Sequence, residues 1–212
     1  MNNSHHYRHN TSICFFFNKK IKVGILGGSF DPPHLGHLHI SAIALKRLNL
    51  DEIWWLVTPQ NRLKKNDVRA TFIKRLQKAR EFTQNINKIR VLDIEYKNKL
   101  FSSYKTLRFL KNKSQKTKFV WIMGSDNLEN FHQWLKPKLI SRIFPVAVIE
   151  RPSYSYRVLN SIGASVLGKR LKKLRTKSFN YNFSSWVFIK DKLDENSSTK
   201  IRNNTPKLIY EN

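Results

Sequence analysis

The stretch IKVGILGGSFDPPHLGH, residues 21–37, decides the fold. Its first six residues form a short apolar run, which is typical of a strand buried on both faces. Gly27 and Gly28 end the run, and because they lack a Cβ we expect the chain to turn sharply there and to let a ligand approach its backbone. Two prolines then stiffen the loop before a predicted helix, at whose start His34 and His37 stand three residues apart. That spacing directs both side chains toward the same side.

Apolar runs and amphipathic segments alternate along the rest of the chain. We predict further strands at 53–59, 89–94, 118–124, 144–150 and 184–190, and helices at 35–48, 69–83, 103–111, 127–134 and 198–203. This alternation predicts an α/β fold, Rossmann-like and doubly wound, with a mostly parallel sheet in a single domain and a small C-terminal helical element. In such folds ligands bind at the carboxyl ends of the strands, near the point where the strand order reverses. The opening motif follows the first strand, at such an end.

The domain is predicted to span residues 20–205, with a flexible extension at 1–19 and a tail at 206–212. The segment 152–183 gives no clear pattern. A single cysteine, Cys14, cannot form an internal disulfide, and no apolar run approaches the roughly 20 residues that cross a membrane. The amino terminus lacks the features of a signal peptide. We therefore expect a cytoplasmic protein with no membrane partner, and the oligomeric state stays open.

The chain carries 40 basic and 14 acidic residues, a formal net charge of +26. A balance of this kind is typical of proteins with anionic partners, although a compositional bias toward lysine would produce it too. The best candidate for a surface that faces a polyanion is GKRLKKLRTK at 168–177, in a stretch without acidic residues. Non-specific electrostatic binding of nucleic acid is thus possible, and a basic nucleic-acid-binding module is an alternative function.

The opening motif has the chemistry of a phosphate site. The first amides of a helix are unpaired donors at the positive end of its dipole, and two imidazoles beside them suit an anionic oxygen. Three alternatives compete. The glycines do not match the G-x-G-x-x-G fingerprint of dinucleotide sites. A zinc site of His34, His37 and His39 would lack a fourth ligand. The histidines could also be purely structural.

The motif GGSFDPPHLGHL resembles the GG-(S/T)-FDP-x-H-x-GH signature of the nucleotidylyltransferase superfamily, and NSSTKIR (196–202) resembles the second signature, ISSTxIR. Between the two, TPQNRLK (58–64), SSYKTLRFLK (102–111) and GSDNLENFHQW (124–134) resemble segments of the nicotinate-nucleotide adenylyltransferases. The resemblance covers about residues 21–205. It departs from the family pattern at Ser102, Lys105, Arg62 and Asn196, where that family has Tyr, often Asp, Pro and Ile.

The resemblance implies an enzyme that joins ATP and nicotinate mononucleotide into deamido-NAD with release of pyrophosphate, in NAD biosynthesis. Other acceptors, nicotinamide mononucleotide or phosphopantetheine, are alternatives. It implies Mg²⁺ carried by the ATP phosphates, with no metal ligands from the protein. The implied catalytic residues are His34, His37 and Arg202. The implied phosphate-binding residues are Gly27, Gly28, Ser29, Phe30, Ser198, Thr199 and Arg202. The implied residues for the mononucleotide are Ser103, Gly124, Asp126 and Trp134, of which Asp126 could instead cap a helix and Trp134 could instead be core.

Overall fold

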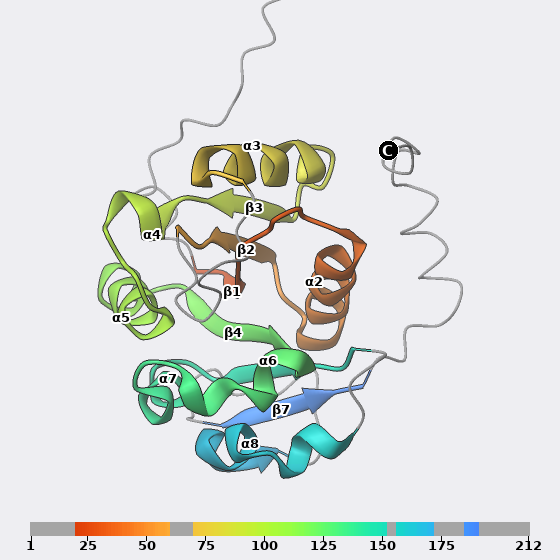
Figure 1. Cartoon of the computed structure of the whole chain (residues 1–212), viewed down its shortest axis with the longest axis vertical. Coiled ribbons are helices and arrows are strands. Elements are labelled where there is room, and N and C mark those ends of the chain that lie inside the picture. Colours follow the sequence, from red (N-terminus) through yellow and green to blue (C-terminus); the bar gives the residue numbers. More distant parts are fainter. Residues whose placement is uncertain (1–19, 60–69, 152–155, 172–184, 191–212) are drawn as a thin grey trace, which may run out of the picture.

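The computed structural model describes residues 20–59, 70–151, 156–171 and 185–190. Its centre is a seven-stranded sheet in the order β3-β2-β1-β4-β5-β7-β6, in which every pair of neighbouring strands is parallel (Figure 1). The strands are β1 (Lys22–Gly28), β2 (Glu52–Val57), β3 (Ile89–Leu92), β4 (Lys118–Gly124), β5 (Val146–Ile149), β6 (Arg170–Leu171) and β7 (Trp186–Ile189). The predicted Rossmann-like α/β fold is confirmed.

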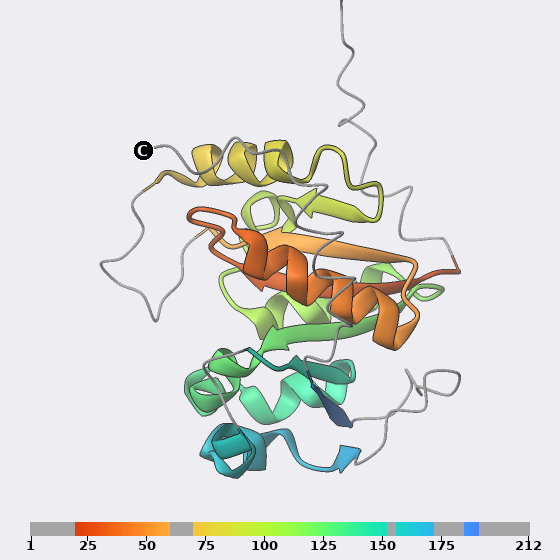
Figure 2. The same cartoon turned by 90° about the vertical axis from the view of Figure 1, so that its right-hand side faces the viewer.

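Helices cover both faces of the sheet and enclose two apolar cores. Figures 1 and 2 show α2 against one face, and Figure 1 shows α5 and α7 on the other side. Leu38 and Ile43 of α2 and Leu76 of α3 belong to one core, whereas Leu107 of α5 and Ile140 of α7 belong to the other. The helices are α2 (Leu35–Leu48), α3 (Phe72–Thr83), α4 (Ile94–Lys97), α5 (Ser103–Lys113), α6 (Ser125–Glu129), α7 (Pro137–Ile143) and α8 (Ile162–Leu167), with short 3₁₀ helices η1 (Phe131–Gln133) and η2 (Tyr156–Asn160).

The strand order reverses between β1 and β4. From β1 the chain winds outward through β2 to β3, then returns to place β4 on the other side of β1. The connections on the two sides of this point depart toward opposite faces, so the carboxyl ends of β1 and β4 flank an open crevice.

The two glycines of the opening motif lie inside β1, where they pair with Leu56 and Val57 of β2. The prediction that the chain turns at these glycines is wrong, because neither has a positive φ. Gly27 is required for space instead: a Cβ there would lie 2.7 Å from Cη2 of Trp121 on the neighbouring strand β4. The turn falls at Phe30, with φ 49°, and at the cis peptide bond between Asp31 and Pro32.

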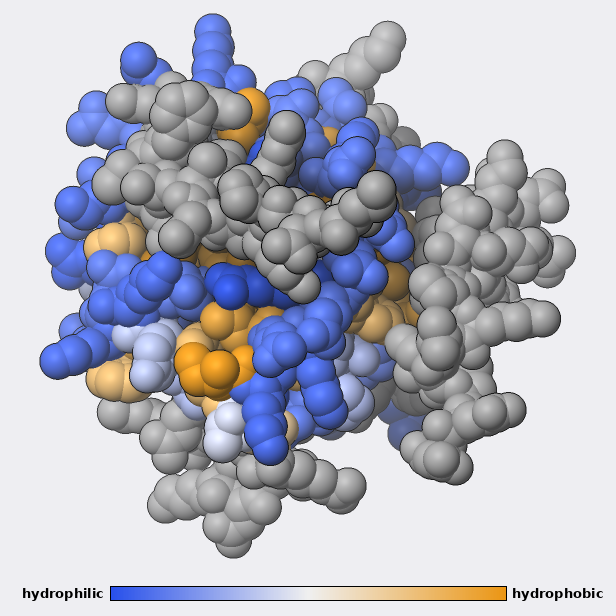
Figure 3. All heavy atoms as spheres, turned by 90° about the horizontal axis from the view of Figure 1, so that it is seen from above, coloured by the Kyte–Doolittle hydropathy of each residue, from blue (hydrophilic) through white to orange (hydrophobic). Residues whose placement is uncertain are grey.

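The described surface at the α3 end of the molecule is largely hydrophilic (Figure 3). Seen from the α3 end of the molecule, polar and charged residues cover much of the described face, with smaller apolar areas between them (Figure 3). On α3 itself, Lys74 and Lys78 are exposed while Leu76 and Ala79 are buried, which gives the helix one polar and one apolar side.

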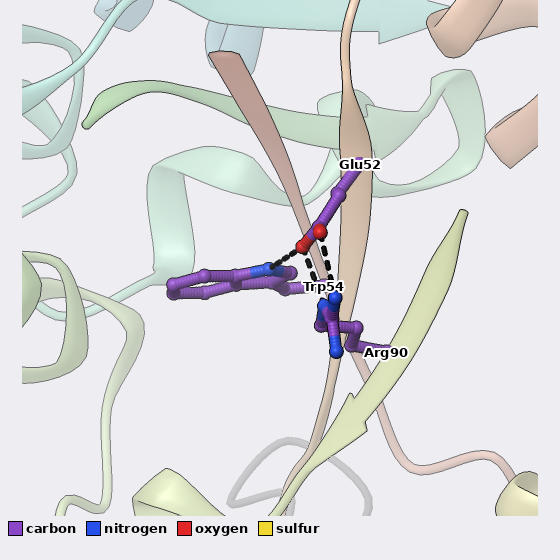
Figure 4. Close-up of polar contacts among 3 residues, drawn as sticks. All are labelled: Glu52, Trp54 and Arg90. Carbon is purple, nitrogen blue, oxygen red and sulfur yellow. Dashed lines mark hydrogen bonds and ion pairs between the residues drawn. The ribbon is translucent and has the colours of Figure 1, made fainter. Parts of the chain in front are cut away.

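Hydrogen bonds among three side chains connect β3 with β2. Glu52 accepts hydrogen bonds from Nε and Nη2 of Arg90 at 2.6 and 2.8 Å, and from Nε1 of Trp54 at 3.1 Å (Figure 4). A bidentate pair of an arginine and a carboxylate holds the two side chains in a defined relative orientation and also contributes an attractive ion pair. The contact joins neighbouring strands and supports their register.

The long predicted elements are confirmed to within a few residues at each end, whereas several short ones were not predicted. These are α4, α7, η2, α8 and β6, the last three inside the segment 152–183 that gave no pattern. The predicted helix at 198–203, the extension at 1–19 and the tail at 206–212 lie outside the described residues. Within the described ranges, no helix has the length and apolarity that crossing a membrane requires.

Candidate active site

A cavity of about 650 Å³ opens at the carboxyl ends of β1 and β4, where the strand order reverses. Ten of the residues predicted for the site line this one cavity, although the first and the last of them, Gly27 and Trp134, are more than a hundred positions apart. They are Gly27, Gly28, Ser29, Phe30, His34, His37, Ser103, Gly124, Asp126 and Trp134. Ser198, Thr199 and Arg202, together with the rest of the second signature, lie outside the described residues.

His34 and His37 cap the first turn of α2 and hold each other in place. Nδ1 of His34 accepts a hydrogen bond from the amide of Gly36 at 3.1 Å, and Nδ1 of His37 accepts one from the amide of His34 at 3.2 Å. The two rings lie 3.9 Å apart, as the three-residue spacing predicts. Because each Nδ1 is an acceptor, the proton of each neutral ring must sit on Nε2. The cap therefore leaves two Nε2–H donors that have no hydrogen-bond partner among the described residues.

Both histidines are neutral at physiological pH. Burial, and then the adjacent His34 and Arg151, together lower the pKa of His37 to about 3. Burial and Arg151 also lower the pKa of His34, with Asp126 acting in the opposite direction. The site thus offers uncharged N–H donors rather than imidazolium ions.

Phe30 packs against the ring of His37. Its side chain is buried, stacks on Trp55 with 4.7 Å between ring centroids, and lies 4.7 Å from the His37 ring. The aromatic ring is therefore part of the core as well as of the cavity wall. Its neighbours Gly28 and Ser29 bring their backbone to the same wall, beside the start of α2.

Asp126 does not cap a helix, so that alternative is wrong. α6 begins at Ser125, its N-cap is Gly124, and no side chain caps it. Asp126 instead accepts a hydrogen bond from Nη1 of Arg151 at 3.1 Å, and its buried Oδ1 has no partner among the described residues. A Cβ at Gly124 would collide with that carboxylate and lie 2.9 Å from Nε of Arg151. Glycine here makes room for the ion pair at the edge of the cavity.

Trp134 and Ser103 form the far side of the cavity. Trp134 is half-buried and packs against Phe131 and Trp121, with 5.2 and 6.2 Å between ring centroids, while part of it reaches the cavity. It serves the core and the cavity wall together. Ser103 is the first residue of α5, whose N-cap is Ser102, so its amide has no partner within the helix.

Sequence reasoning missed several charged residues at or beside the site, among them Arg151, Glu95 and Arg75. Arg151 lies just beyond β5 and lines the cavity. Glu95 also lines it, is 3% exposed, and burial raises its pKa to about 7. Single charged residues in ordinary polar segments give no signal in the sequence, because burial decides their role.

Arg75 of α3 is 1% exposed and joins the loops after β1 and β2. It donates hydrogen bonds to the carbonyl oxygens of Ser29 at 2.6 Å, Thr58 at 2.9 Å and Pro59 at 3.0 Å. Burial lowers its pKa, and Asp31 acts against that shift. A buried cation surrounded by carbonyl oxygens has acceptors for its N–H donors, and it holds the loop that contains Ser29 in one position.

Comparison with known proteins gives a consistent result. Residues 25–204 match the family model described as cytidylyltransferase-like. The chain is 40% identical over 182 residues to a probable nicotinate-nucleotide adenylyltransferase of Ruegeria sp. (strain TM1040), which covers 85% of this chain and 95% of the relative. It is 38% identical over 184 residues to the protein of the same name from Agrobacterium fabrum, covering 86% and 98% of the two chains.

Solved structures share the fold. The nicotinic acid mononucleotide adenylyltransferase of Plasmodium falciparum, complexed with NaAD, superimposes with a TM-score of 0.61 at 20% sequence identity. The match covers 84% of this chain and 79% of the other. At this identity the likeness concerns the arrangement of strands and helices.

Proposed function

This chain belongs to the nicotinate-nucleotide adenylyltransferase family, and we propose that it transfers the adenylyl group of ATP to nicotinate mononucleotide, giving deamido-NAD and pyrophosphate in NAD biosynthesis. The observation that carries the proposal is the pair of neutral imidazoles, His34 and His37, whose Nε2–H groups have no partner in the described part of the chain. Both residues line the cavity that the residues predicted for the mononucleotide also line. ATP and the mononucleotide are the two small-molecule partners. ATP is an intracellular substrate, and we place the reaction in the cytoplasm.

The phosphates of ATP are assigned to the β1 end of the cavity. The backbone at Gly27, Gly28, Ser29 and Phe30 lies there beside the first turn of α2, where helix amides favour anions. Ser198, Thr199 and Arg202 are assigned to the β- and γ-phosphates on the strength of their signature, which supplies hydroxyl groups and a guanidinium.

The reaction needs positioning and charge stabilisation more than acid–base chemistry. The 5′-phosphate of the mononucleotide is already an anion, so it attacks the α-phosphorus of ATP without a general base. One P–O bond forms, the bond to the bridging oxygen of the leaving pyrophosphate breaks, and no covalent enzyme intermediate arises. Negative charge grows on the α-phosphate oxygens in the transition state, where the Nε2–H groups of His37 and His34 donate hydrogen bonds. Arg202 holds the departing pyrophosphate.

The mononucleotide is assigned to the β4 end. Trp134 offers a flat aromatic face to the pyridine ring, and Asp126, with one carboxylate oxygen unpaired among the described residues, can accept from ribose hydroxyls. Gly124 leaves room for that carboxylate. The free amide and the hydroxyl of Ser103 are assigned to the nicotinate carboxylate.

Mg²⁺ is proposed to travel with the triphosphate. Within the described ranges no three His, Cys, Asp or Glu side chains come together as a metal site, while the carboxylates of Asp31 and Asp126 reach the cavity. This donor set suits a hydrated ion bound mainly by substrate phosphates, whose charge it neutralises when bound.

Pyrophosphate release tests the proposal directly. The full chain is incubated with Mg²⁺-ATP and, in parallel, with nicotinate mononucleotide, nicotinamide mononucleotide or phosphopantetheine. We expect the highest kcat/KM with nicotinate mononucleotide and no turnover with ATP alone. The best turnover with phosphopantetheine would assign the chain to a different acceptor, and no turnover with any acceptor would remove the adenylyltransferase activity.

A further inference from the structure

Glu95 is a buried carboxyl group for which the proposed reaction has no use. It lies in α4, is 3% exposed, and lines the same cavity as Ser102, Ser103 and Trp134. A buried carboxyl group is costly unless it is hydrogen-bonded. Two threonine hydroxyls meet this need, those of Thr58 and Thr106.

These two hydrogen bonds join separate parts of the site through Glu95. Thr58 directly follows β2 and extends the sheet, because its amide donates to the carbonyl oxygen of Gly28 at 2.9 Å. Thr106 is fully buried in the first turn of α5, and its Oγ1 lies 2.9 Å from Oε1 of Glu95. Glu95 therefore connects the end of β2 with the helix whose first residue is Ser103.

Other charged and titratable groups around Glu95 are engaged elsewhere, neutral or exposed. They are Asp93, Tyr96 and Lys97 on or next to its own helix, Arg75 (which contacts Thr58), Lys105 on α5, and Asp31, His34, His37, Asp126, Lys136 and Arg151 on the cavity wall. Lys97 pairs with Asp93 at 3.2 Å, and Arg75 donates to carbonyl oxygens. Burial raises the pKa of Glu95 to about 7, while hydrogen bonds from Thr106 and Thr58 act against the rise.

The hydroxyl of Thr106 has two acceptors and only one proton. Its Oγ1 lies 2.9 Å from Glu95 Oε1 and 3.0 Å from the carbonyl oxygen of Ser102. When Glu95 is ionised it can only accept, so the Thr106 proton points toward it. When Glu95 is protonated it can donate to Thr106 Oγ1, and the Thr106 proton is then free to point toward the Ser102 carbonyl.

The direction of this hydrogen bond matters because the Ser102 carbonyl and the Ser103 amide belong to one peptide group. A donor on the carbonyl polarises the peptide and strengthens its N–H as a donor, since chains of hydrogen bonds reinforce one another. The Ser103 amide is the group assigned above to the nicotinate carboxylate. Protonation of Glu95 also removes a negative charge from the cavity that this carboxylate enters.

We propose that Glu95 is a positioning residue that makes the binding of nicotinate mononucleotide depend on pH, through Thr106 and the Ser102–Ser103 peptide. The inference rests on the proposed function. In acid the protonated Glu95 favours the carboxylate-bearing substrate, and in base the ionised Glu95 opposes it. Binding above neutral pH then takes up one proton from solvent onto Glu95. Nicotinamide mononucleotide has the same phosphate but no carboxylate, so its binding lacks this dependence.

The test compares the two mononucleotides. Dissociation constants of the full chain for both mononucleotides are measured by calorimetry from pH 6 to 8.5. At each pH the dissociation constant for the nicotinate form is divided by that for the nicotinamide form, which cancels the titration of the phosphate that both share. We expect the ratio to rise with pH above about 7, by at most roughly tenfold per pH unit. Glu95→Gln, whose amide can donate permanently to Thr106, is expected to give a flat ratio with tight nicotinate binding throughout.

A second variant separates the hydrogen-bond chain from the charge. Thr106→Val is expected to weaken binding of the nicotinate form at pH 6 and leave the nicotinamide form unchanged. Thr83→Val is the matched control, because Thr83 is also buried and its hydroxyl donates to the carbonyl of Ala79 at 2.9 Å on a helix away from the cavity.

Different outcomes identify different failures. A flat ratio in the unmodified chain, or a pH dependence that Glu95→Gln preserves, overturns the role of Glu95 while the adenylyltransferase reaction stands. An unmodified chain that neither binds nicotinate mononucleotide nor releases pyrophosphate with it overturns the proposed function itself.

Discussion

His37 is held in a state that a free histidine rarely has at mildly acidic pH. Its lowered pKa of about 3 means that the native ring stays neutral where the unfolded ring, with a pKa near 6.5, takes up a proton. Between these two values the unfolded state binds more protons than the native state. The contribution of His37 to stability is therefore complete above pH 6.5 and is lost progressively as the pH falls toward 3. The uncharged ring of His37 suits its role as a hydrogen-bond donor, but it makes the protein less stable in acid.

His37→Ala is expected to lower kcat by about 10²–10³-fold with a smaller change in the KM for ATP, because it removes one donor to the charge that develops in the transition state. The same variant should lose less stability in acid than the unmodified chain, by about 2 kcal/mol between pH 6.5 and 5. Steady-state kinetics and denaturant unfolding at the two pH values measure both effects.

His39→Ala serves as the control, since His39 lies on the same helix but is not among the residues that line the cavity. Unchanged turnover in a folded His37→Ala variant would exclude His37 from the chemistry.

At the scale of elements, α3 acts on the site without lining the cavity. Its Arg75 reaches past the end of the helix to the carbonyl oxygens of Ser29, Thr58 and Pro59, and so joins the loops that follow β1 and β2. Buried acceptors that lose their donor cost far more than the bond contributed. The shape of the proposed phosphate end thus depends on a helix that is separate from it in sequence.

Arg75→Met is expected to lower the free energy of unfolding by about 2–4 kcal/mol, because it leaves several carbonyl oxygens without a donor. It should also raise the KM for ATP, since the loop that contains Ser29 loses its support. Thermal or denaturant unfolding and steady-state kinetics check the two effects.

Lys78→Met provides the comparison, because Lys78 is exposed on the same helix and its loss should change stability by no more than about 0.5 kcal/mol. Equal effects from the two substitutions would mean that the carbonyl contacts of Arg75 contribute nothing.

Element length explains which parts of the fold the sequence could predict. The helix at 35–48 has four turns of apolar periodicity, and buried strands such as 118–124 are continuous apolar runs, so both patterns are legible. α4 has only four residues and α8 six, too few for a period to repeat. Gly27 was assigned to a turn because freedom of φ is its commonest use, whereas its actual reason, the neighbouring Trp121, is a contact between distant segments.

The same reasoning applies to the site. His34, His37, Asp126 and Trp134 stand in motifs whose spacing carries information, and the structure brings them to one cavity. Glu95 directly follows the strand predicted at 89–94, in a segment for which the sequence predicts neither a helix nor a site residue. Its burial results from the packing of β2 and α5 around it, and this is a property of the tertiary structure alone.

At the scale of the whole molecule, charge is the dominant feature. A formal net charge of +26 on 212 residues attracts polyanions whatever their sequence, and much of the face in Figure 3 is hydrophilic. The cavity, by contrast, is a confined site at the strand ends, and the residues that line it include Asp31, Glu95 and Asp126. Attraction of long polyanions to the surface and recognition of nucleotides in the cavity are therefore separate properties.

Nucleic acid is expected to bind weakly and without sequence preference. Two unrelated oligonucleotides of equal length should show equal affinity by fluorescence anisotropy, and both affinities should fall by at least about tenfold between 50 and 200 mM salt, because binding releases condensed counterions. Tight binding that survives at 200 mM salt and discriminates between the two sequences would instead support a dedicated nucleic-acid surface.

The contact between Gly27 and Trp121 restricts how this protein can evolve. The indole of Trp121 on β4 fills the volume that a methyl group at Gly27 on β1 would need, so a larger residue at Gly27 requires the indole to move or to be replaced. An alanine at Gly27 is tolerated only after Trp121 has been replaced by a smaller residue, so the two mutations can be accepted in one order only. The central pair of strands is thus a point of epistasis, and a suppressor of a damaging change at either residue should be sought at its neighbour across the ladder.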